Sequence, residues 1–252
     1  VKLQIFSNKN LCHKSSIFYK GLERIELSYS FWKKIITDIK TKKIILEPFD
    51  EESYIFCKQF KERVLLKISA SEHDNVLMIN DAVKNFKKVF FNISGYKLKE
   101  ISKLFQNIKI AKKKVILMYG FQSFPSNPKD LRMGIINEIK KAGFEAGYAD
   151  HTETTSLIGT YITTANALDL GARYIEKHIT LDRKKKKPDY ITSFNPSDFQ
   201  DYVNFFKLKY LDAYKKKKVA ISKKEIIYCR VMGKFAVSDK IFEKNEKIQK
   251  KY

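Results

Sequence analysis

The stretch FEAGYADHTETTSLIGTYITTANALDLGARYIEKHI, residues 144–179, holds an apolar run, an amphipathic segment and a second apolar run. Both runs are short and flanked by turn residues, which is typical of buried strands, and the segment between them has the length of a helix. Gly143 and Gly171 stand where the glycines that follow helices belong. The stretch therefore predicts one strand–helix–strand unit of a parallel α/β sheet.

The same alternation continues along most of the chain. Seven apolar runs are expected to be strands: 1–6, 43–49, 64–69, 88–94, 114–120, 144–149 and 172–179. Amphipathic segments between them are expected to be helices: 28–40, 50–60, 75–86, 97–108, 129–142 and 155–171, with Ser28 and Asp50 as N-caps. The strand spacing of roughly 20–40 residues favours a (βα)8 barrel over a doubly wound sheet. Because such a barrel has eight strands, we expect its first strand to precede residue 1.

The alternation stops near Val219. We expect residues 1–218 to form the barrel, and residues 219–252 to form a linker and the beginning of a second small domain. Two short strands are expected within 231–248. The chain begins with a strand already under way and ends without an obvious stop signal, which predicts a fragment of a longer protein.

The composition is strongly basic. The chain has 50 Lys and Arg against 28 Asp and Glu, a formal net charge of +22. No basic cluster is combined with aromatic residues or glycines on one element, so we interpret the lysine runs as solvated faces and expect no nucleic-acid partner. Three scattered cysteines fit a reducing cytoplasm, and no signal peptide or membrane-spanning stretch is visible.

Polar residues interrupt the expected strands at every second position, which places them on one face of each strand. These sets are Lys2 and Gln4, Lys67 with Ser69 and Ser71, and Glu176 with His178. Ala149 and His151 follow the same parity at the end of the strand 144–149. Polar side chains near the carboxyl ends of barrel strands form the active site in this fold. The pattern therefore predicts a site inside the barrel.

His151 and His178 are two of only four histidines in the chain. Two neutral imidazoles can ligate a divalent metal and leave positions open for water and a substrate oxygen, whereas a lone histidine is more often a hydrogen-bonded core or rim residue. Lysines in the same interior indicate a phosphate or carboxylate substrate. A Schiff base on Lys67 or Lys2 is the rival chemistry.

Seven motifs follow one another in a fixed order. They are KLQIF, EPFDEES, LKISASEHDN, MYGFQSFPSNPKDLRM, GYADHT, GARYIEKHITLDR and PDYITSFNPSDF. Together they resemble the sialic acid synthases, that is, N-acetylneuraminate synthases and the related legionaminic and pseudaminic acid synthases. The resemblance implies a TIM barrel followed by an antifreeze-like (SAF) domain, in a cytoplasmic enzyme that is a homodimer when full length. It also implies condensation of phosphoenolpyruvate with an N-acetylated amino sugar, such as N-acetylmannosamine, assisted by Mn or Mg.

The resemblance also implies roles for single residues. It implies phosphoenolpyruvate binding by Lys2, Lys67, Ser69, Ser71, Ser94 and Gln122, sugar binding by Gln4, Phe124 and Asp189, catalysis by Glu72 and Glu176, and metal ligation by His151 and His178. An acidic first strand and an arginine of the SAF domain are expected outside residues 1–252. We therefore expect little synthase activity from this chain alone.

Six positions depart from the pattern of this family. Two of them are Gln122, where Asn is common in some members, and Phe124, where Tyr is common. Glu47 replaces a Ser or Thr, Ala70 a phosphate-binding Ser, and Ile93 and Ala149 positions that are often Ser. A carboxylate at position 47 is expected to repel a trianionic substrate unless it points away. Each lost hydrogen bond costs about 1–3 kcal/mol when its partner stays buried and unpaired. The departures therefore favour an altered substrate, weak activity or a non-catalytic barrel that binds sugars or anions.

Overall fold

The structure is a computed structural model that describes residues 1–40, 42–105, 111–155, 157–210, 221–232, 241 and 243–247. The chain divides into two units, Val1–Phe206 and Lys207–Tyr252. In the first unit, eight parallel strands are hydrogen-bonded in their order along the chain. They are β1 (Lys2–Ile5), β2 (Ile45–Pro48), β3 (Leu65–Ile68), β4 (Val89–Asn92), β5 (Val115–Tyr119), β6 (Glu145–Asp150), β7 (Tyr174–Ile179) and β8 (Ser193–Phe194).

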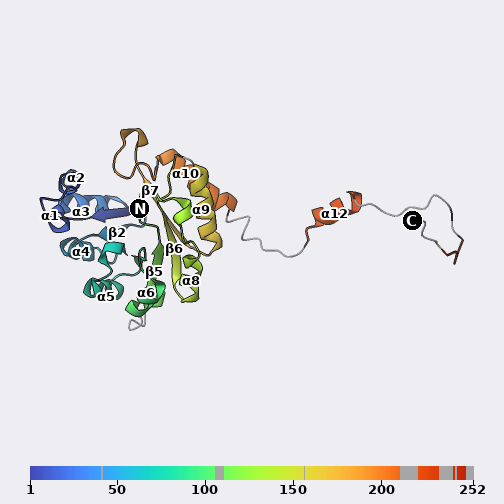
Figure 1. The fold of residues 1–252 in the computed structure, drawn as a ribbon, viewed down its shortest axis with the longest axis horizontal. Coiled ribbons are helices and arrows are strands. Elements are labelled where there is room, and N and C mark those ends of the chain that lie inside the picture. Colours follow the sequence, from blue (N-terminus) through green and yellow to red (C-terminus); the bar gives the residue numbers. More distant parts are fainter. Residues whose placement is uncertain are drawn as a thin grey trace. The chain divides into compact units, whose positions relative to one another are not determined.

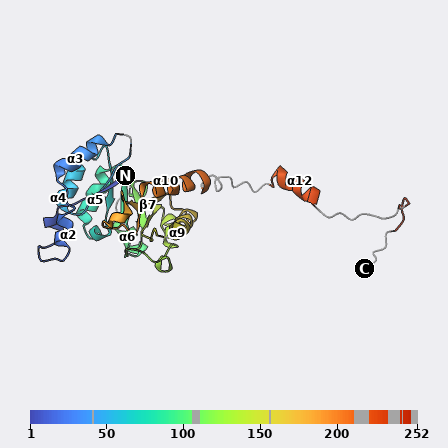
Figure 2. The same cartoon turned by 90° about the horizontal axis from the view of Figure 1, so that it is seen from above.

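Helices cover the outside of this curved sheet (Figure 1). The α-helices of the first unit are α1 (Asn8–Leu11), α2 (Tyr19–Glu23), α3 (Tyr29–Asp38), α4 (Glu51–Lys58), α5 (Val76–Asn85), α6 (Leu98–Phe105), α7 (Ala111–Lys114), α8 (Ile135–Lys141), α9 (Leu157–Asp169) and α10 (Pro196–Asn204). Short 3-10 helices are η1 (Ala70–Glu72), η2 (Pro128–Asp130) and η3 (Arg183–Lys185), and a π-helix, η4, spans Phe205–Tyr210. Figures 1 and 2 both show α3, α4 and α5 on one side of the sheet and α9 on the other.

Local sequence signals determine where these helices begin and end. The side chain of Ser28 accepts a hydrogen bond from the Phe31 amide at the start of α3, and Asp50 accepts from the Ser53 amide at the start of α4. Gly143 and Gly171 have φ angles of 86° and 101°, in the left-handed region that suits glycine after a helix. The predicted caps and the seven predicted strands are confirmed.

The strand count needs one correction, because β8 was not predicted. This strand has two residues, and it pairs in parallel with β7 through His178 with Ser193 and Ile179 with Phe194. A run that short carries no readable periodicity, so pattern analysis treats it as loop. The hydrogen-bonded ladder runs from β1 to β8. The expected strand before residue 1 stays a prediction.

Two apolar layers hold the first unit together. The larger one lies between sheet and helices and contains fully buried residues such as Ile5, Leu46 and Ile136. The smaller one lies in the interior and is built around Phe90 and Ile116. On three strands, an apolar residue of the smaller cluster comes two positions before a charged one: Ile45 before Glu47, Leu65 before Lys67, and Tyr174 before Glu176. The interior is therefore apolar toward the start of the strands and charged toward their ends.

In the second unit, the described residues contain helix α12 (Lys223–Met232). The prediction of a strand from Val231 is wrong at its start, because Val231 and Met232 end this helix. A reciprocal capping box starts it: Ser222 Oγ accepts from the Glu225 amide at 3.1 Å, and Glu225 Oε2 accepts from the Ser222 amide at 2.7 Å. The predicted boundary at residue 218 and most of the predicted strands fall outside the described residues.

No helix in the described part of the chain is long and apolar enough to cross a membrane.

Candidate active site

Four charged side chains from four strands meet in the interior of the curled sheet, and we refer to them as the ion cluster. Lys2 Nζ lies 2.6 Å from Glu47 Oε2 and 2.9 Å from Glu176 Oε1. Lys67 Nζ lies 2.7 Å from Glu176 Oε1 and 3.3 Å from Glu47 Oε1. β1 and β7 are far apart in the strand order, so the contact between Lys2 and Glu176 requires the sheet to curl. The period-two pattern thus brings residues from distant strands to one point.

The ion cluster is balanced in charge, with two ammonium groups and two carboxylates. Burial alone lowers the pKa of Lys2, but the ion pairs with Glu47 and Glu176 outweigh burial and raise that pKa above its ordinary value. Burial likewise raises the pKa of Glu176, but Lys67 and Lys2 lower it to about 2. Lys2 and Glu176 are therefore charged at neutral pH. Gln4 joins the cluster by donating from Nε2 to Glu47 Oε2 at 3.3 Å.

The two predicted metal-ligating histidines lie side by side. His151 directly follows β6 and His178 belongs to β7, with their ring centroids 5.4 Å apart. His151 Nδ1 lies 2.9 Å from the carbonyl oxygen of Phe121 and must donate to it, which leaves Nε2 of that ring as an acceptor. His178 Nδ1 lies 3.6 Å from Asp189 Oδ2. One ring nitrogen of His151 is therefore free of a proton.

Both histidines are held in the neutral form, which is the form that binds metals. Burial lowers the pKa of His151. Burial, together with the nearby His151 and Lys2, lowers the pKa of His178 to about 3. Within the described residues, no group of three or more His, Cys, Asp or Glu side chains is arranged to hold a metal. The donor set therefore fits a metal with two protein ligands and open positions for other oxygens.

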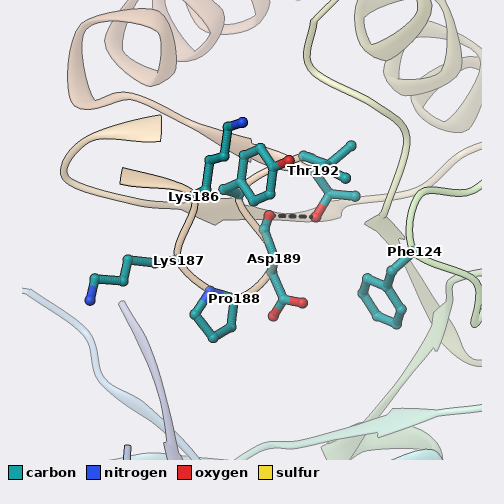
Figure 3. Close-up of a pocket in the computed structure, with 8 residues that line it drawn as sticks. Phe124, Lys186, Lys187, Pro188, Asp189 and Thr192 are labelled. Carbon is teal, nitrogen blue, oxygen red and sulfur yellow. Dashed lines mark hydrogen bonds between the residues drawn. The ribbon is translucent and has the colours of Figure 1, made fainter. Parts of the chain in front are cut away.

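A cavity of about 410 Å³ opens beside the histidines, between Phe124 and the loop Lys186–Thr192. The Phe124 ring lies 4.4 Å from the His151 ring and 5.9 Å from the His178 ring, measured between centroids. Figure 3 shows the Asp189 carboxylate between Pro188 and Phe124. The main-chain oxygen of Asp189 accepts from the Thr192 hydroxyl at 3.1 Å, which holds the loop (Figure 3). The structure thus places the predicted sugar-binding residues Phe124 and Asp189 on one cavity.

Comparison with known proteins identifies the family of this barrel. The NeuB family matches residues 1–217. The chain belongs to the NeuB family. An uncharacterized protein of Methanocaldococcus jannaschii is 24% identical over 215 residues, which cover 82% of this chain and 61% of that relative. The N,N'-diacetyllegionaminic acid synthase of Campylobacter jejuni is 26% identical over 185 residues, which cover 71% of this chain and 53% of that enzyme. The chain spans about half to three fifths of the length of these curated relatives.

A solved structure supports the same fold. The N-acetylneuraminic acid (sialic acid) synthetase of Leptospira borgpetersenii, solved in complex with citrate, matches with a TM-score of 0.76 at 21% identity. The match covers 91% of this chain and 80% of that chain. At this identity the likeness shows the fold alone, and it agrees with the barrel-like sheet described above.

A buried ion pair lies behind the histidines of this NeuB-family chain, and sequence reasoning missed it. Lys177 Nζ lies 3.1 Å from Asp150 Oδ2, and the two side chains are 1% and 0% exposed. Lys177 also donates to the carbonyl oxygen of Thr152, while Asp150 Oδ1 accepts from the Thr152 amide, both at 2.8 Å. The pair therefore fixes the turn that carries His151. The sequence does carry a signal for this pair: Asp150 and Lys177 are oppositely charged residues in neighbouring buried strands, on the face toward the helices, where apolar residues are expected.

Several of the predicted phosphoenolpyruvate-binding residues make no contact with the ion cluster in the described part of the chain. Ser69 instead caps η1 by accepting from the Ser71 amide, and Ser71 is exposed. The buried hydroxyl of Ser94 donates to Asn92 Oδ1 at 2.7 Å and contacts the carbonyl oxygen of Gly120. Gln122 is exposed in the loop after β5. Their predicted roles stay predictions.

Glu72 also lies apart from Glu176, its predicted catalytic partner. It lines a second cavity of about 610 Å³ together with residues of α1 and α4. Its carboxylate accepts from Asn75 Nδ2 at 3.3 Å. Among the described contacts, none joins Glu72 to the ion cluster.

The departures from the family pattern differ in their consequences. Ile93 and Ala149 are each 1% exposed, and Ala149 packs in the interior apolar cluster, so these residues fill space without polar contacts. Ala70 begins η1. Glu47 does not point away from the lysines: its side chain is 3% exposed and pairs with both of them.

Proposed function

We propose that the chain carries the barrel of a sugar-acid synthase, which condenses phosphoenolpyruvate with an N-acetylated amino sugar and releases phosphate. The observation that carries this proposal is the convergence of two lysines, a carboxylate and two neutral histidines inside the barrel of a NeuB-family chain. Relatives named as sialic-type acid synthases support the reaction class.

In this reaction, C3 of phosphoenolpyruvate attacks the aldehyde carbon of the open-chain sugar and forms the new carbon–carbon bond. Water then adds at C2, the bond between C2 and the phosphate oxygen breaks, and phosphate leaves. Lys2 and Lys67 would hold the anionic groups by charge-assisted hydrogen bonds. Because its pKa is about 2, Glu176 is a carboxylate at neutral pH and can accept a proton from the attacking water but cannot donate one.

The two histidines would hold the divalent metal. Such an ion, Mn or Mg, polarises a carbonyl oxygen when it is bound. The hydrogen bond from His151 Nδ1 to Phe121 fixes the tautomer that presents Nε2. Phe124 and Asp189 would contact the sugar at the mouth of the adjoining cavity, where a carboxylate suits sugar hydroxyls.

The rival Schiff-base chemistry is disfavoured by the ion cluster. A lysine that attacks a carbonyl must lose its proton, and enzymes promote this by lowering its pKa. The ion pairs with Glu47 and Glu176 raise the pKa of Lys2 instead. Lys67 is paired with the same two carboxylates.

An assay of phosphate release tests the proposal. Phosphoenolpyruvate, Mn²⁺ and N-acetylmannosamine, or another N-acetylated amino sugar, are supplied to the chain and to the product of its complete reading frame. We expect the latter to release phosphate and to form an acid that contains the carbon atoms of both substrates, detected by mass spectrometry. His151→Ala should abolish both signals. Borohydride trapping of pyruvate on Lys67 or Lys2 would contradict the proposal and favour the Schiff-base reaction.

The SAF domain, the homodimer and the cytoplasmic location belong to the same proposal. The family resemblance supports them. Size-exclusion chromatography of the complete product with light scattering tests the dimer.

A further inference from the structure

The carboxylate of Glu47 bridges the two lysines of the ion cluster. Its Oε2 lies 2.6 Å from Lys2 Nζ, and its Oε1 lies 3.3 Å from Lys67 Nζ. One oxygen therefore faces each ammonium group, which is also how a phosphate or carboxylate ligand bridges two cations. The Glu47 side chain is 3% exposed, so little water competes for these contacts.

The second carboxylate binds differently. Glu176 contacts both lysines through the same oxygen, Oε1, at 2.9 Å and 2.7 Å. With Glu47 present, two positive and two negative charges balance. Without its charge, one ammonium group would stay uncompensated in a mostly buried place, where attraction for an anion is much stronger than in bulk water. Glu47 thus supplies the negative charge that a bound anion would otherwise supply.

We propose that Glu47 is an internal competitor for the anionic group of the substrate, which must displace its carboxylate from Lys2 and Lys67 in order to bind. Glu47 thereby determines how tightly this barrel holds anions. The inference rests on the proposed function, in which the two lysines hold the substrate anion. Gln4 Nε2 already donates to Glu47 Oε2 at 3.3 Å and remains a partner for the displaced carboxylate.

Binding of inorganic phosphate tests this proposal. Isothermal titration calorimetry at fixed ionic strength compares the unaltered chain with Glu47→Gln, which keeps the shape of the side chain and removes its charge. We expect the Kd of the variant for phosphate to fall at least about tenfold, because close charge pairs change binding by that much or more. Glu138→Gln is the matched control: it removes the same charge from an exposed pair on α8 and should leave the Kd unchanged.

A second variant keeps the proposal testable if Glu47→Gln does not fold. Glu47→Asp retains the charge but is one methylene shorter, so its carboxylate cannot reach both lysines at the present distances. We expect its phosphate affinity to lie between those of the unaltered chain and Glu47→Gln. Circular dichroism establishes that each variant is folded.

Two results would overturn the proposal. Equal phosphate affinity in the unaltered chain and in every folded variant would show that Glu47 does not compete. Weaker binding in the variants would show that Glu47 only orients the lysines. The phosphate Kd and the circular dichroism spectrum are both measured without any product being formed. If phosphate binding tightens as expected but no sugar acid forms, the proposed function fails while the competitor role stands.

Discussion

Loss of the Lys177 charge should cost far more stability than loss of an exposed lysine. In Lys177→Met, Asp150 stays fully buried and keeps its hydrogen bonds from the Thr152 amide at 2.8 Å and from the Tyr148 hydroxyl at 3.2 Å. Removing one partner of a buried ion pair typically costs about 3–5 kcal/mol. Since the remaining hydrogen bonds offset part of that cost, we expect the free energy of unfolding to fall by ~3 kcal/mol.

Urea denaturation followed by circular dichroism measures this change, and Lys141→Met is the control. Lys141 pairs with Glu138 on α8, but the two side chains are 65% and 55% exposed. Such a pair contributes at most about 1 kcal/mol. Asp150→Asn combined with Lys177→Met should recover part of the loss, because it removes the unpaired charge. The reasoning fails if Lys177→Met costs less than about 1 kcal/mol, or no more than the control.

Three further predictions follow from buried polar residues. Burial lowers the pKa of His73, so the unfolded chain takes up a proton more readily, and the free energy of unfolding should decrease as the pH falls below the ordinary value of about 6.5. In urea denaturation between pH 7 and 5, the free energy of unfolding of His73→Phe should decrease less steeply than that of the unaltered chain. An equally steep decrease would contradict this. His151→Ala should weaken Mn²⁺ binding in calorimetry at least about tenfold, whereas His13→Ala, at an exposed position, should not. Asp50→Ala removes acceptors for the amides of Ser7 and Ser53 and should cost about 2 kcal/mol in urea denaturation; a loss below about 0.5 kcal/mol would refute its role as a buried cap.

Much of the fold was predictable because its signals are local. Ser28 and Asp50 cap helices through hydrogen bonds to amides three residues ahead, and Gly143 and Gly171 adopt positive φ angles. Each of these features depends on a few neighbouring residues. β8 was missed because its two residues are defined by pairing with β7 and not by any pattern of their own.

The candidate site was predictable in part, because alternation shows which face of a strand a residue occupies but not what it meets there. Alternation placed Lys2, Lys67 and Glu176 in the interior, but it could not show that both lysines also pair with Glu47.

Glu47 illustrates this limit most sharply. From the sequence alone, a carboxylate beside anion-binding lysines is expected to repel an anionic substrate, and its side chain is therefore expected to point away from the site. In the folded barrel the same lysines hold the carboxylate in place, because a buried ammonium group without a counter-ion is costly. The charges that would attract a substrate are thus the charges that draw Glu47 inward. We therefore expect a substitution at position 47 to leave the two lysines and the two histidines in place and to change how tightly the site holds an anion.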